Sequence, residues 1–202
     1  MRKNGFTLAE VLITLGIIGV VAALTMPALI ANYQKQIKVT KLKKFYSVIN
    51  QAMKLSSVDN GDLEAWLPDV TNANFPDWYK EYLSPYIQTL ETTIITLGHN
   101  YVQTAFNDGS GFVTYRNLIN TNIWFFYCLE YKNCEPESFN GKDTFLFSIC
   151  PDGRFRTSGC FDDLSREELL YLCKNPDSDK KRHYCTRLIE LDDWQIKDDY
   201  PW

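Results

Sequence analysis

The sequence predicts an α+β fold: one long N-terminal helix, apolar in its first half and amphipathic in its second, packed on a small antiparallel sheet. Three observations predict it. Val11 to Ala31 carries no charge, the residues after Tyr33 show apolar positions at helical spacing, and short segments with turn signals fill Leu63 to Trp202. A chain of 202 residues that is 45% hydrophobic and 14% aromatic can form a core in the last of these regions.

The uncharged run is long enough to cross a membrane. Val11 to Ala31 has 21 residues, and as a helix it spans roughly 32 Å. A secretory signal cut near Val21-Ala22-Ala23 is one explanation, and a plain membrane anchor is another. Two residues favour something more specific: Glu10 puts a carboxylate at the mouth of the run, where it needs a partner, and Pro27 favours a kink or local melting.

Gly5-Phe6-Thr7-Leu8-Ala9-Glu10 lies between the basic Arg2-Lys3 start and the apolar run, whereas a secretory signal is cut after its apolar segment. This string resembles the cleavage and methylation motif of type IV prepilins and type II secretion pseudopilins, and the resemblance covers about the first 31 residues. It implies a pilin-like fold, cleavage between Gly5 and Phe6 by a membrane prepilin peptidase, and N-methylation of Phe6. It also implies that Glu10 governs assembly and that Pro27 loosens the helix.

The resemblance implies a structural subunit of a type IV pilus-like or type II secretion pseudopilus filament, not an enzyme. Its partners are then the prepilin peptidase, other pilin or pseudopilin subunits, and the bacterial inner membrane, crossed once with the N-terminus cytoplasmic and the head periplasmic or extracellular. Residues 1–5 become a leader peptide, 6–31 the transmembrane and filament-core helix, 32–60 an amphipathic stem and 61–202 a disulfide-containing head. The alternative is an extracytoplasmic binding protein or enzyme on an uncleaved N-terminal anchor.

Glu10 has a chemical reason to act in assembly. Cleavage frees an α-amine at Phe6 that stays cationic at neutral pH. In an apolar filament core, Glu10 of one subunit can pair with the amine of a neighbour, and a buried ion pair of this kind sets register more than it adds stability. The alternative is that Glu10 only reaches to the membrane interface.

The stem is predicted to pack on its own head through an apolar stripe with spacings of three and four: Val39, Leu42, Tyr46, Ile49 and Met53. Lysines on another face repeat every three residues: Lys35, Lys38, Lys41 and Lys44. Residues 32–58 hold six lysines and no acid, whereas residues 59–202 hold 13 bases and 24 acids, a net charge of −11. The lysines are either a solvated face or attract the acidic heads of neighbouring subunits.

The head is predicted from turn and cap signals. The stem stops at Asp59-Asn60-Gly61-Asp62. We next expect a helix over Pro76 to Leu90 that is broken at Pro85, and then a hairpin of Tyr101–Phe106 and Phe112–Tyr115. A strand over Ile123 to Cys128 follows, and then a hairpin of Phe145–Cys150 and Arg154–Arg156 around Pro151-Asp152-Gly153. A helix over Ser165 to Cys173 begins with a Ser165–Glu168 capping box. We expect a strand or coil over Cys185 to Leu191, then an aromatic tail from Trp194 to Trp202.

Six cysteines lie in the second half of the chain: Cys128, Cys134, Cys150, Cys160, Cys173 and Cys185. An even number behind an export signal indicates disulfides in an oxidising compartment. A metal site is disfavoured, because there is no CxxC pair and neither His99 nor His183 has ligand spacing. Of the fifteen possible connectivities we favour the sequential one: Cys128–Cys134, Cys150–Cys160 and Cys173–Cys185.

Other site types find little support. Neither histidine has a nucleophile in recognisable context, and His183 is interpreted as surface charge. No cofactor is expected; the pairs Asp162-Asp163, Asp192-Asp193 and Asp198-Asp199 raise calcium, but a solvated acidic surface is favoured. An acidic head is a poor ligand for nucleic acid, which argues against a minor pilin of DNA uptake. Gly141-Lys142-Asp143-Thr144-Phe145 is similar to a G-x-D-x-F segment of type II secretion-like pseudopilins.

Overall fold

The computed structural model describes residues 7–66, 71–117, 122–158, 160, 163–176, 178 and 181–201. Gly5, Phe6, Asp162 and Trp202, on which parts of the sequence predictions rest, lie outside the described residues. The chain divides into two compact units, Met1–Ile37 and Lys38–Trp202. Helix α1, Leu8–Asn60, contributes to both units.

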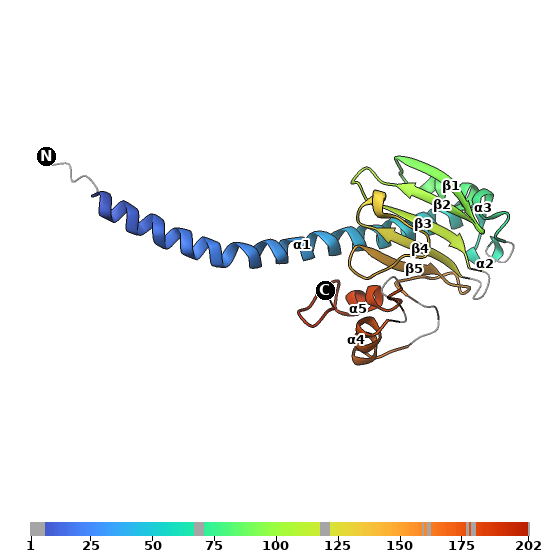
Figure 1. Ribbon diagram of the computed structural model, residues 1–202. Coiled ribbons are helices and arrows are strands. Elements are labelled where there is room, and N and C mark those ends of the chain that lie inside the picture. Colours follow the sequence, from blue (N-terminus) through green and yellow to red (C-terminus); the bar gives the residue numbers. More distant parts are fainter. Residues whose placement is uncertain are drawn as a thin grey trace. The chain divides into compact units, whose positions relative to one another are not determined.

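The head carries a six-stranded antiparallel sheet in which each strand pairs with the next along the chain (Figure 1). The strands are β1 (Glu91–Leu97), β2 (His99–Ala105), β3 (Gly111–Arg116), β4 (Ile123–Cys128), β5 (Thr144–Ile149) and β6 (Phe155–Arg156). The helices are α2 (Leu63–Trp66), α3 (Phe75–Tyr82), α4 (Arg166–Lys174) and α5 (Cys185–Leu191), with short 3-10 turns η1 (Ser84–Tyr86) and η2 (Tyr131–Asn133). The predicted α+β class is confirmed.

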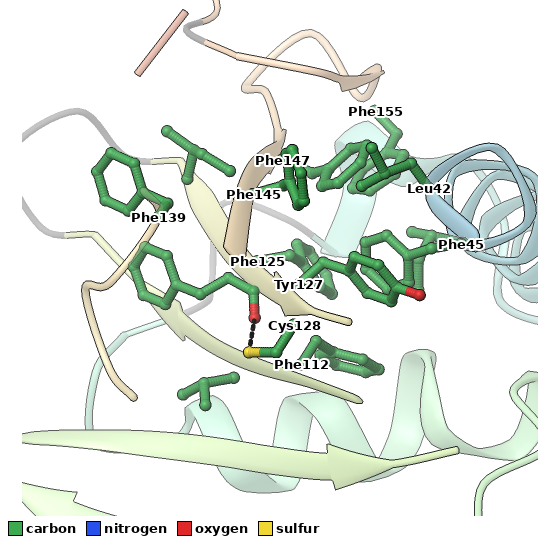
Figure 2. Close-up of a cluster of buried hydrophobic side chains, with 14 of the residues drawn as sticks. Leu42, Phe45, Phe112, Phe125, Tyr127, Cys128, Phe139, Phe145, Phe147 and Phe155 are labelled. Atoms are coloured by element: carbon green, nitrogen blue, oxygen red, sulfur yellow. Dashed lines mark hydrogen bonds between the residues drawn. The ribbon is translucent and has the colours of Figure 1, made fainter. Parts of the chain in front are cut away.

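The part of α1 beyond Lys38 packs on one face of the sheet through side chains that recur every three or four residues. Phe45 lies at the centre of this contact (Figure 2). Its ring centroid is 4.5 Å from that of Tyr127, 5.0 Å from Phe147 and 5.4 Å from Phe112. The predicted apolar stripe is therefore confirmed, although Phe45, which the prediction left out, is its most enclosed aromatic contact.

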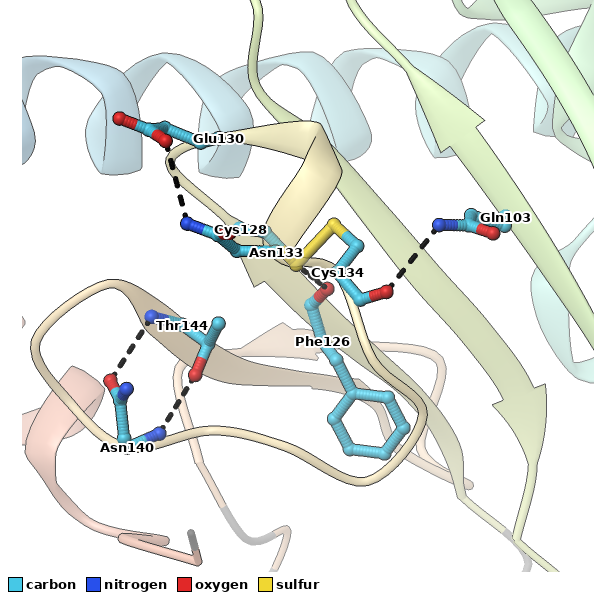
Figure 3. The surroundings of a disulfide bond; sticks show 8 residues. All are labelled: Gln103, Phe126, Cys128, Glu130, Asn133, Cys134, Asn140 and Thr144. Atoms are coloured by element: carbon cyan, nitrogen blue, oxygen red, sulfur yellow. Dashed lines mark hydrogen bonds between the residues drawn. A yellow bond between two sulfur atoms is a disulfide. The ribbon is translucent and has the colours of Figure 1, made fainter.

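The opposite face of the sheet is covered by the chain between β4 and β5. Successive strand residues point to opposite faces, so Phe126 points away from Phe45, and its ring stacks on Phe139 at 5.5 Å. The Cys128–Cys134 disulfide begins this covering segment (Figure 3). With both faces covered, β3 and β5 are buried along their whole length.

The structure pairs the six cysteines sequentially, as the sequence predicts. The Cα atoms are 5.5 Å apart in Cys128–Cys134, 5.5 Å in Cys150–Cys160 and 4.9 Å in Cys173–Cys185. These distances lie in the normal range for a disulfide. Each bond closes a short local loop, and the third joins α4 to the start of α5.

One predicted element has the wrong type, one is too long, and several elements were missed, among them β1, α2 and η2. Cys185–Leu191, expected as strand or coil, is the helix α5, because its buried residues Cys185, Leu188 and Ile189 recur at helical spacing. The threonine- and isoleucine-rich β1 was not foreseen. The predicted break and turns are confirmed: α3 ends before η1, which contains Pro85, both hairpins form, and the Ser165–Glu168 capping box begins α4. The helix expected to resume after Pro85 and run to Leu90 is wrong, because the helical turn η1 ends at Tyr86.

The C-terminal segment closes against the head. The Tyr200 hydroxyl donates a buried hydrogen bond of 2.6 Å to the Gly141 carbonyl, and the Trp194 ring lies 5.4 Å from Tyr46 of α1. Gly141 has a φ of 74°, and a Cβ built on it would lie 2.8 Å from the Cys185 Cβ. Position 141 therefore requires glycine for its backbone conformation and for space.

We expect Gly141→Ala to lower the free energy of unfolding by about 3 kcal/mol or more, since strain at positive φ adds to a clash with a disulfide. Gly98→Ala is the matched control: Gly98 has a φ of 72° and nothing within 4 Å of the place that an added methyl group would take, so its cost is about 1 kcal/mol. Denaturant unfolding of the detergent-solubilised chain measures both. Equal losses would show that the contact with Cys185 does not restrict position 141.

Candidate functional site

The first described residues form a capping box at the start of α1. The Thr7 backbone N–H and hydroxyl both donate to Glu10 Oε2, each at 2.8 Å. The Glu10 N–H donates in return to Thr7 Oγ1 at 3.3 Å. Two N–H groups that a helix start leaves without partners are thereby satisfied. The sequence prediction assigned Glu10 to assembly and missed this contact, although T-x-x-E before an apolar run is its signature.

The capping box fixes where the Glu10 carboxylate lies. The side chain turns back toward the N-terminus of α1 and is held by the residue that follows Phe6 in the sequence. The positive end of the helix dipole stabilises a carboxylate at this place. Gly5 and Phe6 lie outside the described residues, so cleavage and methylation stay predictions here.

Beyond the cap, α1 exposes apolar side chains on all sides. Leu12 is 62% exposed, Ile18 63% and Leu29 70%. Among the described residues, α1 is the one helix whose length and apolar character would allow it to cross a membrane. Pro27 lies inside the helix, which continues on both sides of it, and the predicted kink stays a prediction. A helix that is apolar all round needs lipid or other helices around it.

Farther along α1, the lysines contact their own head. Lys38 Nζ lies 3.1 Å from Asp143 Oδ1, and Lys44 Nζ lies 3.0 Å from Asp108 Oδ2. Lys41 Nζ donates to the Asp108 and Leu129 carbonyls at 3.2 and 3.3 Å. Two interpretations of these lysines follow from the sequence, a solvated face and attraction between subunits. Neither predicts these contacts within the chain. Attraction between subunits stays a prediction.

Asp108 is the acidic centre of this contact. Burial alone would raise its pKa, but hydrogen bonds from Ser110 and Lys44 outweigh that effect and lower the pKa to about 2. Asp143 lies in the predicted Gly-x-Asp-x-Phe segment, where Asn140 Oδ1 accepts hydrogen bonds from the Lys142, Asp143 and Thr144 N–H groups. Figure 3 shows Asn140 and Thr144 facing each other across this turn. The segment thus presents a carboxylate to Lys38.

One aspartate of each acid pair near the C-terminus is engaged with bases. Arg166 donates to both oxygens of Asp192, at 2.6 and 2.9 Å, and to both oxygens of Asp199, each at 2.9 Å. Lys197 also donates to Asp192, at 2.6 Å. Within the described part of the chain, no group of three His, Cys, Asp or Glu side chains has metal-binding geometry. These contacts anchor the segment after α5 to the start of α4.

The two histidines pack against aromatic rings. The His183 ring centroid is 4.7 Å from that of Phe139, so it helps to seal the segment that covers the sheet. His99 Nδ1 lies 3.0 Å from the Asn72 amide, and its ring packs against Tyr115 at 5.5 Å. Both positions are accounted for by packing.

The N-terminal cap, the exposed apolar helix and the antiparallel sheet together define a pilin-like protein. Residues 1–26 match the family described as Prokaryotic N-terminal methylation motif, typical of type IV pilins and pseudopilins. Residues 28–202 match the family described as Family of unknown function (DUF6613), and the chain belongs to that family. Neither the curated proteins nor the solved structures contain a match to the chain.

The methylation motif points to a structural subunit and not to an enzyme. It implies processing by a peptidase and assembly with other pilin-type subunits. With the apolar part of α1, it fits a protein anchored in the inner membrane with an extracytoplasmic head.

The Lys44–Asp108 contact predicts a pH dependence. Because the pKa of Asp108 lies near 2 in the folded state, below its ordinary value of 3.8, its contribution to stability is present above about pH 4 and is lost as the pH falls toward 2. Asp108→Asn should therefore be less stable than the wild type at pH 5, with a difference that shrinks by pH 2. Thermal unfolding midpoints between pH 2 and 5 measure this, and a pH-independent difference would contradict it.

Proposed function

We propose that this protein is a structural subunit of a type IV pilus-like or type II secretion pseudopilus filament. The order of features at the N-terminus carries the proposal: the methylation motif matches residues 1–26, and the exposed apolar helix, capped at Thr7 and Glu10, begins at Leu8, after the Gly5-Phe6 site. A cleaved secretory signal would remove the apolar segment, whereas cleavage between Gly5 and Phe6 keeps it for the filament core.

Before assembly, the subunit is stored in the inner membrane as a single span with its N-terminus in the cytoplasm. The three disulfides support a head outside the cytoplasm, since such bonds persist in oxidising compartments. A prepilin peptidase removes residues 1–5, and Phe6 is methylated. Extrusion then exchanges the lipid around the apolar helix for the helices of other subunits.

Glu10 sets the register of that exchange. A carboxylate in an apolar layer is costly unless it is paired, and the new α-amine at Phe6 is a cation of matching charge. Pairing of Glu10 with the amine of an adjacent subunit fixes how far one helix advances past the next.

Glu10→Gln and Glu10→Ala should leave expression and membrane insertion intact but block incorporation into filaments, because the amine of the neighbour loses its anion. Thr25→Ala is the matched control, since the Thr25 hydroxyl bonds within its own helix to the Val21 carbonyl; it should assemble normally. Filament yield in sheared fractions is the measurement. A normal yield from Glu10→Ala would sink the register mechanism.

Gly5→Leu should leave the precursor uncut, because a side chain beside the scissile bond obstructs a peptidase site that otherwise meets bare backbone. Mass spectrometry of the membrane-extracted protein identifies its first residue. We expect N-methyl-Phe6 in the wild type and an intact leader in the variant. A wild-type protein that keeps Met1, or that begins near Thr25, would instead support the anchored binding protein or enzyme.

A further inference from the structure

The strand β1 is an open edge of the sheet. It stands at one end of the strand order, and β2 is its hydrogen-bonded neighbour among the strands that the structure describes. Its seven residues pair with β2 without a gap, from Glu91 opposite Ala105 to Leu97 opposite His99. The backbone groups along its other side are therefore available to a further strand.

The usual protections of an edge strand are absent from β1. Its sequence, ETTIITL, has no lysine, arginine or proline, the residues that most often prevent edge pairing. Ile94 and Leu97 are each 62% exposed, and Leu90, just before the strand, is 69% exposed. Glu91 is the single charged residue of the strand, although residues 59–202 carry a net charge of −11. At β1, two acidic heads can approach with little charge repulsion.

The exposed row of β1 continues a buried face of the sheet. Ile94 pairs with Val102, and Thr92 pairs with Thr104; these positions lie on the face that α1 covers farther along the sheet, since Thr104 pairs with Phe112, a contact of Phe45. At β1 that cover has ended, and Thr92, Ile94 and Thr96 are exposed. An added strand would extend this face and enclose Ile94.

We propose that β1 pairs antiparallel with β1 of a second copy of this chain, centred on Ile94. In this register Ile94 lies opposite Ile94 of the second copy, Thr92 opposite its Thr96, and Glu91 opposite its Leu97. No like charges face each other, and β-branched pairs of this kind stabilise a ladder. A shift by two residues shortens the ladder and no longer sets Ile94 opposite Ile94; in one direction it pairs Ile95 with Ile95, on the other face of the sheet.

A second copy fits this edge better than an unstructured peptide. In each copy β1 is already extended and held by β2, so pairing requires little ordering, whereas a flexible segment loses conformational entropy when it binds. The contact is isologous, because the same patch serves on both sides. A filament whose subunits all point one way lacks the required two-fold axis, so the contact joins two unassembled subunits or subunits of two filaments. It does not depend on the filament function.

Cysteine cross-linking of the full chain in detergent tests the register. Ile94→Cys places two thiols directly opposite each other across the pair, with Cβ atoms about 5 Å apart, so mild oxidation should give a disulfide-linked dimer. Leu97→Cys is the matched control, with the same exposure of 62% but opposite Glu91, and it should give no disulfide-linked dimer. Equal dimer yields from the two variants would overturn the proposal.

Charge substitution tests the contact itself, with size-exclusion chromatography and light scattering as the readout. Ile94→Lys sets two lysines opposite each other and should abolish the dimer. Leu97→Lys sets each lysine opposite Glu91 and should retain it. A monomeric wild type, or a dimer that survives Ile94→Lys, would overturn the proposal. Loss of the dimer in both variants would also overturn it, since that is the behaviour of an apolar contact without this register.

Discussion

The Phe45 ring is the contact on which the head depends. It lies within 4.5 to 6.3 Å of rings on β3, β4, β5 and β6, so a single helix side chain is packed against four strands of the sheet. Removing the helix would expose the inner face of the sheet to water, with a cost of roughly 25 cal/mol for each Å² of apolar surface. The strands and the second half of α1 therefore fold as one unit, which begins at Lys38.

This constraint changes how the lysines of α1 are understood. In the sequence they form a positive stem next to a negative head, which leaves open a solvated face or attraction between different subunits. Because Phe45 holds the helix against the sheet, Lys38 and Lys44 meet Asp143 and Asp108 of the same chain. Exposed ion pairs are each worth little, so these contacts adjust the charge of the interface more than they hold it together. The charges of Lys38 and Lys44 are therefore already paired with carboxylates of the same chain when subunits assemble.

The sequence predicted those elements whose signals are local. Asn107 to Gly111 and Pro151-Asp152-Gly153 mark turns by residue type, and the capping box at Ser165 marks a helix start. Signals that depend on distant partners were missed. Lys38 and Asp143 are 105 residues apart. β1 was missed for another reason, because its partner β2 follows it directly across Gly98 and no two-residue hairpin signal marks this turn. The helix α5 is short, so its burial against β5, and not its propensity, decides its conformation.

The Thr7–Glu10 cap explains how Glu10, the residue proposed to act in filament assembly, can be accommodated in a membrane before assembly. An unpaired carboxylate at the edge of an apolar layer loses its hydration. Two donors from Thr7 replace part of that hydration within the chain, and the start of a helix adds favourable dipole charge. Neither donor is a full cation, so the α-amine of a neighbour still offers Glu10 a stronger, charge-assisted partner. Under the proposed function, storage and assembly then differ in the partner of the Glu10 carboxylate as well as in the surroundings of the apolar helix.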